Sequence, residues 1–76
     1  MTFTITEISS DLVGCIGIFT KHANRKKFAA FFPSAREVDT HIVSVTVTKR
    51  DLFSAMRDIA DVVNNELHDE CIFDVE

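Results

Sequence analysis

Thiols and imidazoles, which can act as nucleophiles or as sulfur and nitrogen ligands of a metal ion, are few in this 76-residue chain: two cysteines and three histidines. Cys15 stands between apolar neighbours in LVGCIGIF, where a free cysteine behaves as a small hydrophobic side chain. Cys71 follows Asp69 and Glu70, and neighbouring negative charge raises the pKa of a thiol. Neither cysteine is therefore expected to supply a reactive thiolate.

The segment His68–Cys71 (HDEC) places an imidazole and a thiol at i, i+3, a spacing that suits two metal ligands. A structural zinc site takes four ligands, and no CxxC or HxxxH pattern supplies the others. Only a second subunit could complete such a site. His22 and His41 are expected at the surface. We predict no metal site and no cofactor.

Carboxylates are numerous, but they lack the apolar surroundings that would raise their pKa for acid–base catalysis. We therefore predict no catalytic residue and no enzymatic activity. The acids are concentrated in residues 58–76, which contain seven of them and no Lys or Arg. Such a stretch would attract a basic patch on another protein. The predicted protein-binding residues are Asp58, Asp61, Glu66, Asp69 and Glu70.

Four cations lie together in KHANRKK, without an intervening acid: Lys21, Arg25, Lys26 and Lys27. These four residues define the alternative function, a nucleic-acid-binding regulator whose cations contact phosphates. The overall composition argues against it, because the sequence pI is near 5.2, whereas nucleic-acid-binding domains typically have a pI above about 9. The neighbouring phenylalanines of KFAAFF could stack on bases, but they are predicted to pack in the core.

The elements that would position these groups follow from hydrophobic periodicity. Residues 2–8, 41–48 and 71–76 alternate polar and apolar side chains, as strands do. Residues 12–20 are apolar on both faces, as in a central strand, and the two glycines there suggest a bulge or a close neighbour. KFAAFF (27–32) is expected as a further strand, joined to the preceding strand by a hairpin with Asn24 near its tip. PSAREVDT (33–40) is expected as a loop.

One helix is expected after Thr48, whose hydroxyl and the carboxylate of Asp51 resemble a capping box. It should fade at NNELHD (64–69). Its apolar stripe is predicted to contain Leu52, Phe53, Met56, Ile59, Ala60, Val63 and Leu67.

The predicted fold is a single α+β domain, residues 1–76. It has a mainly antiparallel sheet of four to five strands, in the order β-β-β-β-α-β, with one amphipathic helix packed on it. The last strand is expected to return parallel to the fourth strand or to pair with another subunit. One helix covers one face of a sheet, yet two strands are apolar on both faces. This mismatch predicts a homodimer.

The chain shows no secretion signal and no apolar run of the ~20 residues that would span a bilayer. Two cysteines are too few for a disulfide scaffold, so we expect a cytoplasmic protein with reduced thiols and no membrane contact. The expected function is that of a small acidic binding protein that modulates or inhibits a larger protein target. Accessory proteins of phages, prophages and bacteria are of this type.

Overall fold

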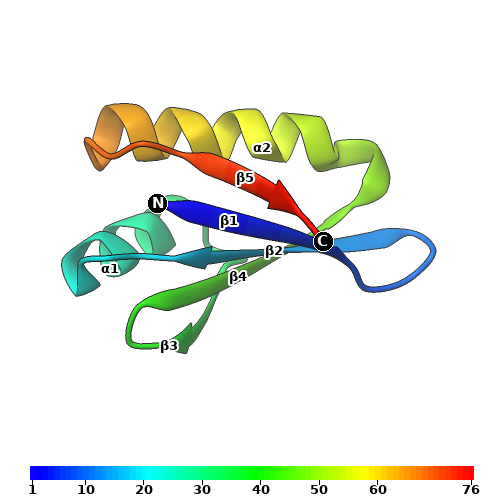
Figure 1. Ribbon diagram of the computed structural model, residues 1–76, viewed down its shortest axis with the longest axis horizontal. Helices are drawn as coiled ribbons and strands as arrows, with labels where there is room; N and C mark the ends of the chain where they lie inside the picture. Colours follow the sequence, from blue (N-terminus) through cyan, green and yellow to red (C-terminus); the bar gives the residue numbers. More distant parts are fainter.

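The computed structural model describes residues 1–76, which form one five-stranded mixed sheet and two helices (Figure 1). In chain order the elements are β1 (Thr2–Glu7), β2 (Leu12–Ile18), α1 (His22–Phe31), β3 (Arg36–Asp39), β4 (Ile42–Thr48), α2 (Leu52–Asp61) and β5 (Ile72–Val75). A 3-10 turn, Lys49–Asp51, precedes α2, and a π-turn, Val62–Glu66, follows it. Neither helix is long and apolar enough to cross a membrane.

The strands lie in the order β3-β4-β2-β1-β5, so β2 is central, as its apolar residues on both faces predicted. All neighbouring strands are antiparallel except β1 and β5, which are parallel. The predicted α+β class and mainly antiparallel sheet are therefore confirmed. Strand registers place the even-numbered residues of β1, β2, β4 and β5 on one face of the sheet, which we call the open face. The odd-numbered residues form the opposite face, against which the helices pack.

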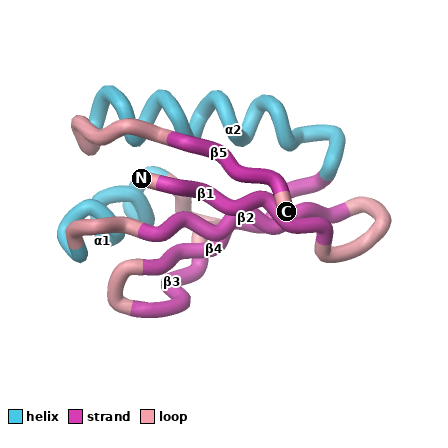
Figure 2. Tube along the Cα trace, viewed as in Figure 1, coloured by secondary structure: helices cyan, strands magenta, loops and turns pink.

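A cluster of phenylalanines forms the centre of the core on the helix-covered face. The ring of Phe3 lies 6.1 Å from Phe19, 5.5 Å from Phe28 and 5.7 Å from Phe73, measured between centroids. These rings come from β1, from the residue after β2, from α1 and from β5, so one cluster joins helix α1 to the sheet. Figure 2 shows how α1 and α2 flank the strands that carry these rings.

The hairpin predicted around Asn24 is wrong, because residues 22–31 form helix α1 and KFAAFF is its last part. A short apolar run does not distinguish a strand from a buried helix by its pattern alone. Lys, Arg and Ala are good helix formers, and the i, i+4 spacing brings Phe28 and Phe32 to 4.6 Å on one side of the chain. The missing strand, β3, lies instead within the segment expected as a loop. The observed order is thus β-β-α-β-β-α-β, with two helices where one was expected.

Helix α2 begins where the sequence predicted. The backbone N–H of Asp51 donates to Thr48 Oγ1 (3.3 Å), and the Thr48 hydroxyl donates to the Asp51 carboxylate (2.8 Å). Ile59, Val63 and Leu67 of the predicted stripe are buried. Phe53 is the exception, because it is 81% exposed at the first turn of the helix.

The last strand does not pair with the fourth. Strand β5 runs in the same direction as β4, but both edges of β4 are already occupied, by β2 and β3. The crossover through α2 therefore passes over β2 and β1, and β5 pairs with the free edge of β1, where Thr2 is opposite Ile72 and Phe3 is opposite Phe73.

Candidate functional site

The five predicted protein-binding acids lie in two places. Asp58, Asp61 and Glu66 are exposed on α2 and the π-turn. Asp69 and Glu70 lie in the loop before β5, where the amino group of Met1 donates to the Glu70 carbonyl (2.7 Å) and lies 3.8 Å from the Asp69 carboxylate. These two residues thus hold the start of β1 beside the start of β5. The three acids of α2 and the π-turn have no comparable structural contact.

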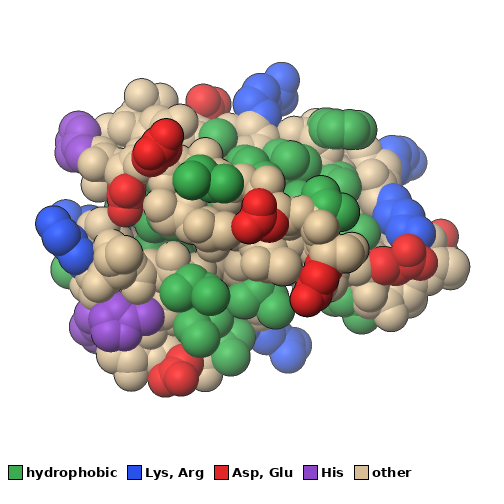
Figure 3. All heavy atoms as spheres, in the orientation of Figure 1, with side chains coloured by type: hydrophobic (Ala, Val, Ile, Leu, Met, Phe, Trp, Pro, Cys, Tyr) green, Lys and Arg blue, Asp and Glu red, His purple; other side chains and the backbone are tan.

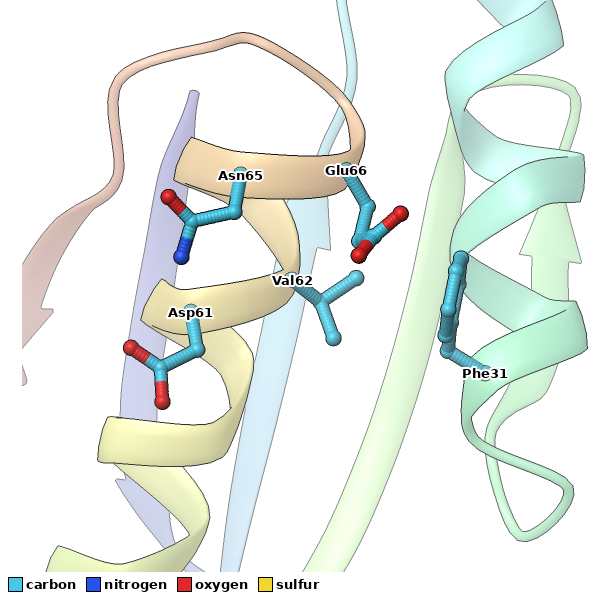
Figure 4. A pocket seen from close by; sticks show the side chains of 5 residues that line it. All are labelled: Phe31, Asp61, Val62, Asn65 and Glu66. Atoms are coloured by element: carbon cyan, nitrogen blue, oxygen red, sulfur yellow. The ribbon is translucent and has the colours of Figure 1, made fainter.

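Two of those acids line a groove between the last turns of α1 and of α2. The groove has a volume of about 270 Å³ and is lined by Phe31, Asp61, Val62, Asn65 and Glu66. In Figure 4, Val62 and Glu66 point toward Phe31 across the groove, whereas Asp61 and Asn65 lie on the other side of their helix. We call this feature the acidic groove.

The phenylalanine of the acidic groove is the residue that the sequence prediction missed. Phe31 was assigned to the core of a strand, but it is 49% exposed. The reason is helical geometry: Phe28 and Phe32 pack together (4.6 Å), whereas Phe31 is turned by about 60° from Phe28 and about 100° from Phe32 around the helix. Helical spacing within KFAAFF was the signal that could have identified an outward-facing ring.

The π-turn forms the other wall and ends the helix. The Leu67 N–H donates to the Val62 carbonyl (3.0 Å), and the Asp69 N–H donates to the Val63 carbonyl (3.0 Å). His68 has the left-handed backbone angle φ of 52° that commonly ends helices. π-turns within helices are rare and are frequent at functional sites. The predicted fading of the helix within 64–69 coincides with this turn.

The acids of the groove form no ion pair. The four ion pairs of the structure involve Asp69, Glu37, Glu7 and Asp51. None includes Asp58, Asp61 or Glu66. An unpaired carboxylate beside an exposed aromatic ring can accept a cation from a partner without first breaking an internal ion pair.

The predicted basic residues do not lie on a hairpin tip but on and just before α1. Lys21, Lys26 and Lys27 are exposed. Arg25 is only 6% exposed, and its Nη1 lies 3.0 Å from Glu37 Oε2 of β3. One of the four predicted nucleic-acid contacts is therefore used inside the molecule, where it joins α1 to the edge of the sheet.

The two thiols are poor nucleophiles. Burial raises the pKa of Cys15 above its ordinary value of 9.0. The pKa of Cys71 is also raised, chiefly by burial and further by Asp69, against the opposing effect of the Met1 ammonium. No three His, Cys, Asp or Glu side chains form a group that could hold a metal ion. His22 and His41 are exposed neighbours whose rings lie 6.1 Å apart, and His22 Nδ1–H donates to the Thr40 carbonyl (2.7 Å).

Protein-family models, curated proteins and solved structures were all compared with this chain, and none of them matches it.

Proposed function

We propose that this chain acts by binding another protein, without catalysis, and that the acidic groove is its contact site. The partner's segment would carry an apolar side chain that packs between Phe31 and Val62, with a Lys or Arg next to it. One observation carries this proposal: a half-exposed phenylalanine lies beside a carboxylate that has no ion-pair partner.

The two parts of the groove would contribute differently to binding. An aromatic ring that becomes buried at an interface is a common energetic hot spot. Charge complementarity between Asp58, Asp61, Glu66 and a basic partner would mainly accelerate encounter and select the partner. With the aromatic ring supplying affinity and the acids selecting the partner, a chain of 76 residues with one such groove could recognise a target specifically.

The remaining features of the proposal follow from the same chemistry. Protonated thiols and the absence of an oriented acid–base pair support binding over catalysis. Two unpaired cysteines support a cytoplasmic location. We further propose that the chain self-associates and modulates a larger target, as small phage or bacterial accessory proteins do.

Selection of randomised displayed peptides against the purified chain tests the groove. We expect selected peptides to combine an apolar residue with Lys or Arg, and Phe31→Ala and Glu66→Lys to weaken their binding about tenfold or more. Asp11→Lys is the matched control, because it reverses an exposed acid in the β1–β2 loop at the other end of the molecule (Figure 1). Peptides without cations, or equal affinities for all three variants by titration calorimetry, would refute the groove as the site.

Nucleic-acid binding remains the second candidate, because Lys21, Lys26 and Lys27 are exposed and form no ion pair. It predicts a salt-sensitive gel shift of DNA or RNA that is lost when these three lysines are replaced by alanine. The absence of any shift at low salt would eliminate this candidate.

A further inference from the structure

Both helices lie on one face of the sheet, and nothing covers the open face. Five of its apolar side chains remain 37–56% exposed: Ile8, Leu12, Ile16, Ile18 and Ile72. In Figure 3, which shows the side on which the strands lie in front of the helices, apolar side chains gather in groups over the sheet with acidic ones between them. Several exposed apolar side chains gathered on one face typically mark an interaction site.

One acid and one cation of the open face lie symmetrically about its centre. Strand registers align one row across all five strands: Asp74 on β5, Thr4 on β1, Ile16 on β2, Ser44 on β4 and Arg36 on β3. Ile16 is at the middle of this row. The acid and the cation lie two strands away from it in opposite directions, roughly 10 Å each by ordinary strand spacing. Neither Asp74 nor Arg36 forms an ion pair within the chain.

We propose that the open face binds the open face of a second copy of this chain, about a two-fold axis that runs along β2 at Ile16. Such an axis exchanges the two ends of the row. It therefore places Arg36 of each copy opposite Asp74 of the other, and Ile16 opposite Ile16. Sheets packed face to face cross at about 30°, which a small tilt of β2 from the axis provides. This assignment rests on the proposed self-association and is independent of the acidic groove.

The shape and size of the open face suit this occupant. Ser34, Arg36, Ser44 and Thr46 line a polar depression of about 420 Å³ on its β3–β4 side, where the partner's β5 would lie. By ordinary strand spacing and rise per residue, the flat outline of a sheet face with five strands of about six residues has an area on the order of 400 Å². Protruding side chains raise the accessible area toward the ~800 Å² that each partner buries in a standard interface. We therefore expect a reversible dimer whose population depends on concentration.

Charge exchange tests the pairing directly by sedimentation equilibrium over a wide range of protein concentrations. The unaltered chain should shift from 8.6 kDa toward twice that mass as its concentration rises. Arg36→Asp and Asp74→Arg should each weaken dimerisation about tenfold or more, because each places like charges opposite one another twice. The double variant Arg36→Asp/Asp74→Arg should restore it. Ile16→Asp, which brings two acids together at the axis, should abolish it.

Each result decides a separate part of the proposal. A mass of 8.6 kDa at every concentration would overturn self-association itself. A dimer unaffected by Ile16→Asp and by both charge reversals would place the interface elsewhere, for example at the free edge of β5. Weakening without rescue in the double variant would refute the Arg36–Asp74 contact. Circular dichroism melting verifies that each variant is folded, and Glu66→Lys, which alters the groove only, should dimerise normally.

Discussion

The close approach of Gly17 to Phe3 yields a sharp test of the core. An added Cβ at Gly17 would overlap one ring carbon of Phe3 and would lie 2.8 Å and 2.9 Å from two others. Phe3 is fully buried and packs against Phe19, Phe28 and Phe73, so its ring has no free space to enter. Gly17→Ala must therefore displace either this ring or the β2 backbone.

The expected cost follows from two opposing effects. Overpacking a core typically costs about 1–3 kcal/mol. Replacing glycine with alanine also restricts the unfolded chain, which stabilises the folded state by about 0.4–1 kcal/mol. This gain applies at Gly17 because its φ is not positive, so alanine can adopt the same backbone conformation. The net loss should be roughly 1–2 kcal/mol, which corresponds to a fall in Tm of roughly 5–15 °C for a domain of this size.

Gly14→Ala on the same strand is the matched control. Its added Cβ would lie 2.9 Å from the terminal methyl of Ile8. Ile8 is 56% exposed and can rotate away, so the change in stability should stay within about 0.5 kcal/mol. Urea and thermal denaturation at one low protein concentration measure both variants. Equal Tm values for Gly17→Ala and Gly14→Ala would show that the Phe3 ring is not held where the structure places it.

Two further predictions concern the Arg25–Glu37 ion pair and the buried thiol. Glu37→Gln should destabilise the fold by about 1 kcal/mol, because it leaves the buried guanidinium of Arg25 without its carboxylate. Arg25→Met should be nearly neutral, since the Arg25 Nε is buried without a hydrogen-bond partner. Urea denaturation measures both variants, and a larger loss of stability for Arg25→Met than for Glu37→Gln would contradict this reasoning. Because the folded state raises the pKa of Cys15, the contribution of this thiol to the free energy of unfolding should be fully present at neutral pH and be lost as the pH rises through and above 9.0. Cys15→Ala should reduce this alkaline loss, and an identical pH dependence in the variant would contradict the assignment.

Local patterns in the chain were sufficient to predict four of the five strands and the second helix. Alternation of polar and apolar residues identifies β1, β4 and β5, because each of these strands has two unlike faces. The apolar residues on both faces of β2 identify the central strand. Thr48 marks the start of α2, because its hydroxyl meets a free backbone N–H nearby in the sequence. These signals depend on neighbours a few residues away.

The candidate site was predicted only in part. The acidic residues Asp61 and Glu66 are evident from charge alone, and they do line the groove. Phe31 was not found, because whether KFAAFF forms a strand or a helix depends on contacts distant in sequence. The ring of Phe28 packs against Phe3 and Phe19, at 5.5 Å and 5.4 Å, and these contacts favour the helix.

Long-range packing also settled the pairing of the last strand. Nothing in CIFDVE specifies its neighbour, and β5 joins β1 because β4 has no free edge. The basic segment shows the same dependence: its composition implies four exposed cations, yet folding buries Arg25 against β3. Alternation and capping are read from adjacent residues, whereas strand partners, buried charges and exposed rings are decided by which surfaces meet when the whole chain packs.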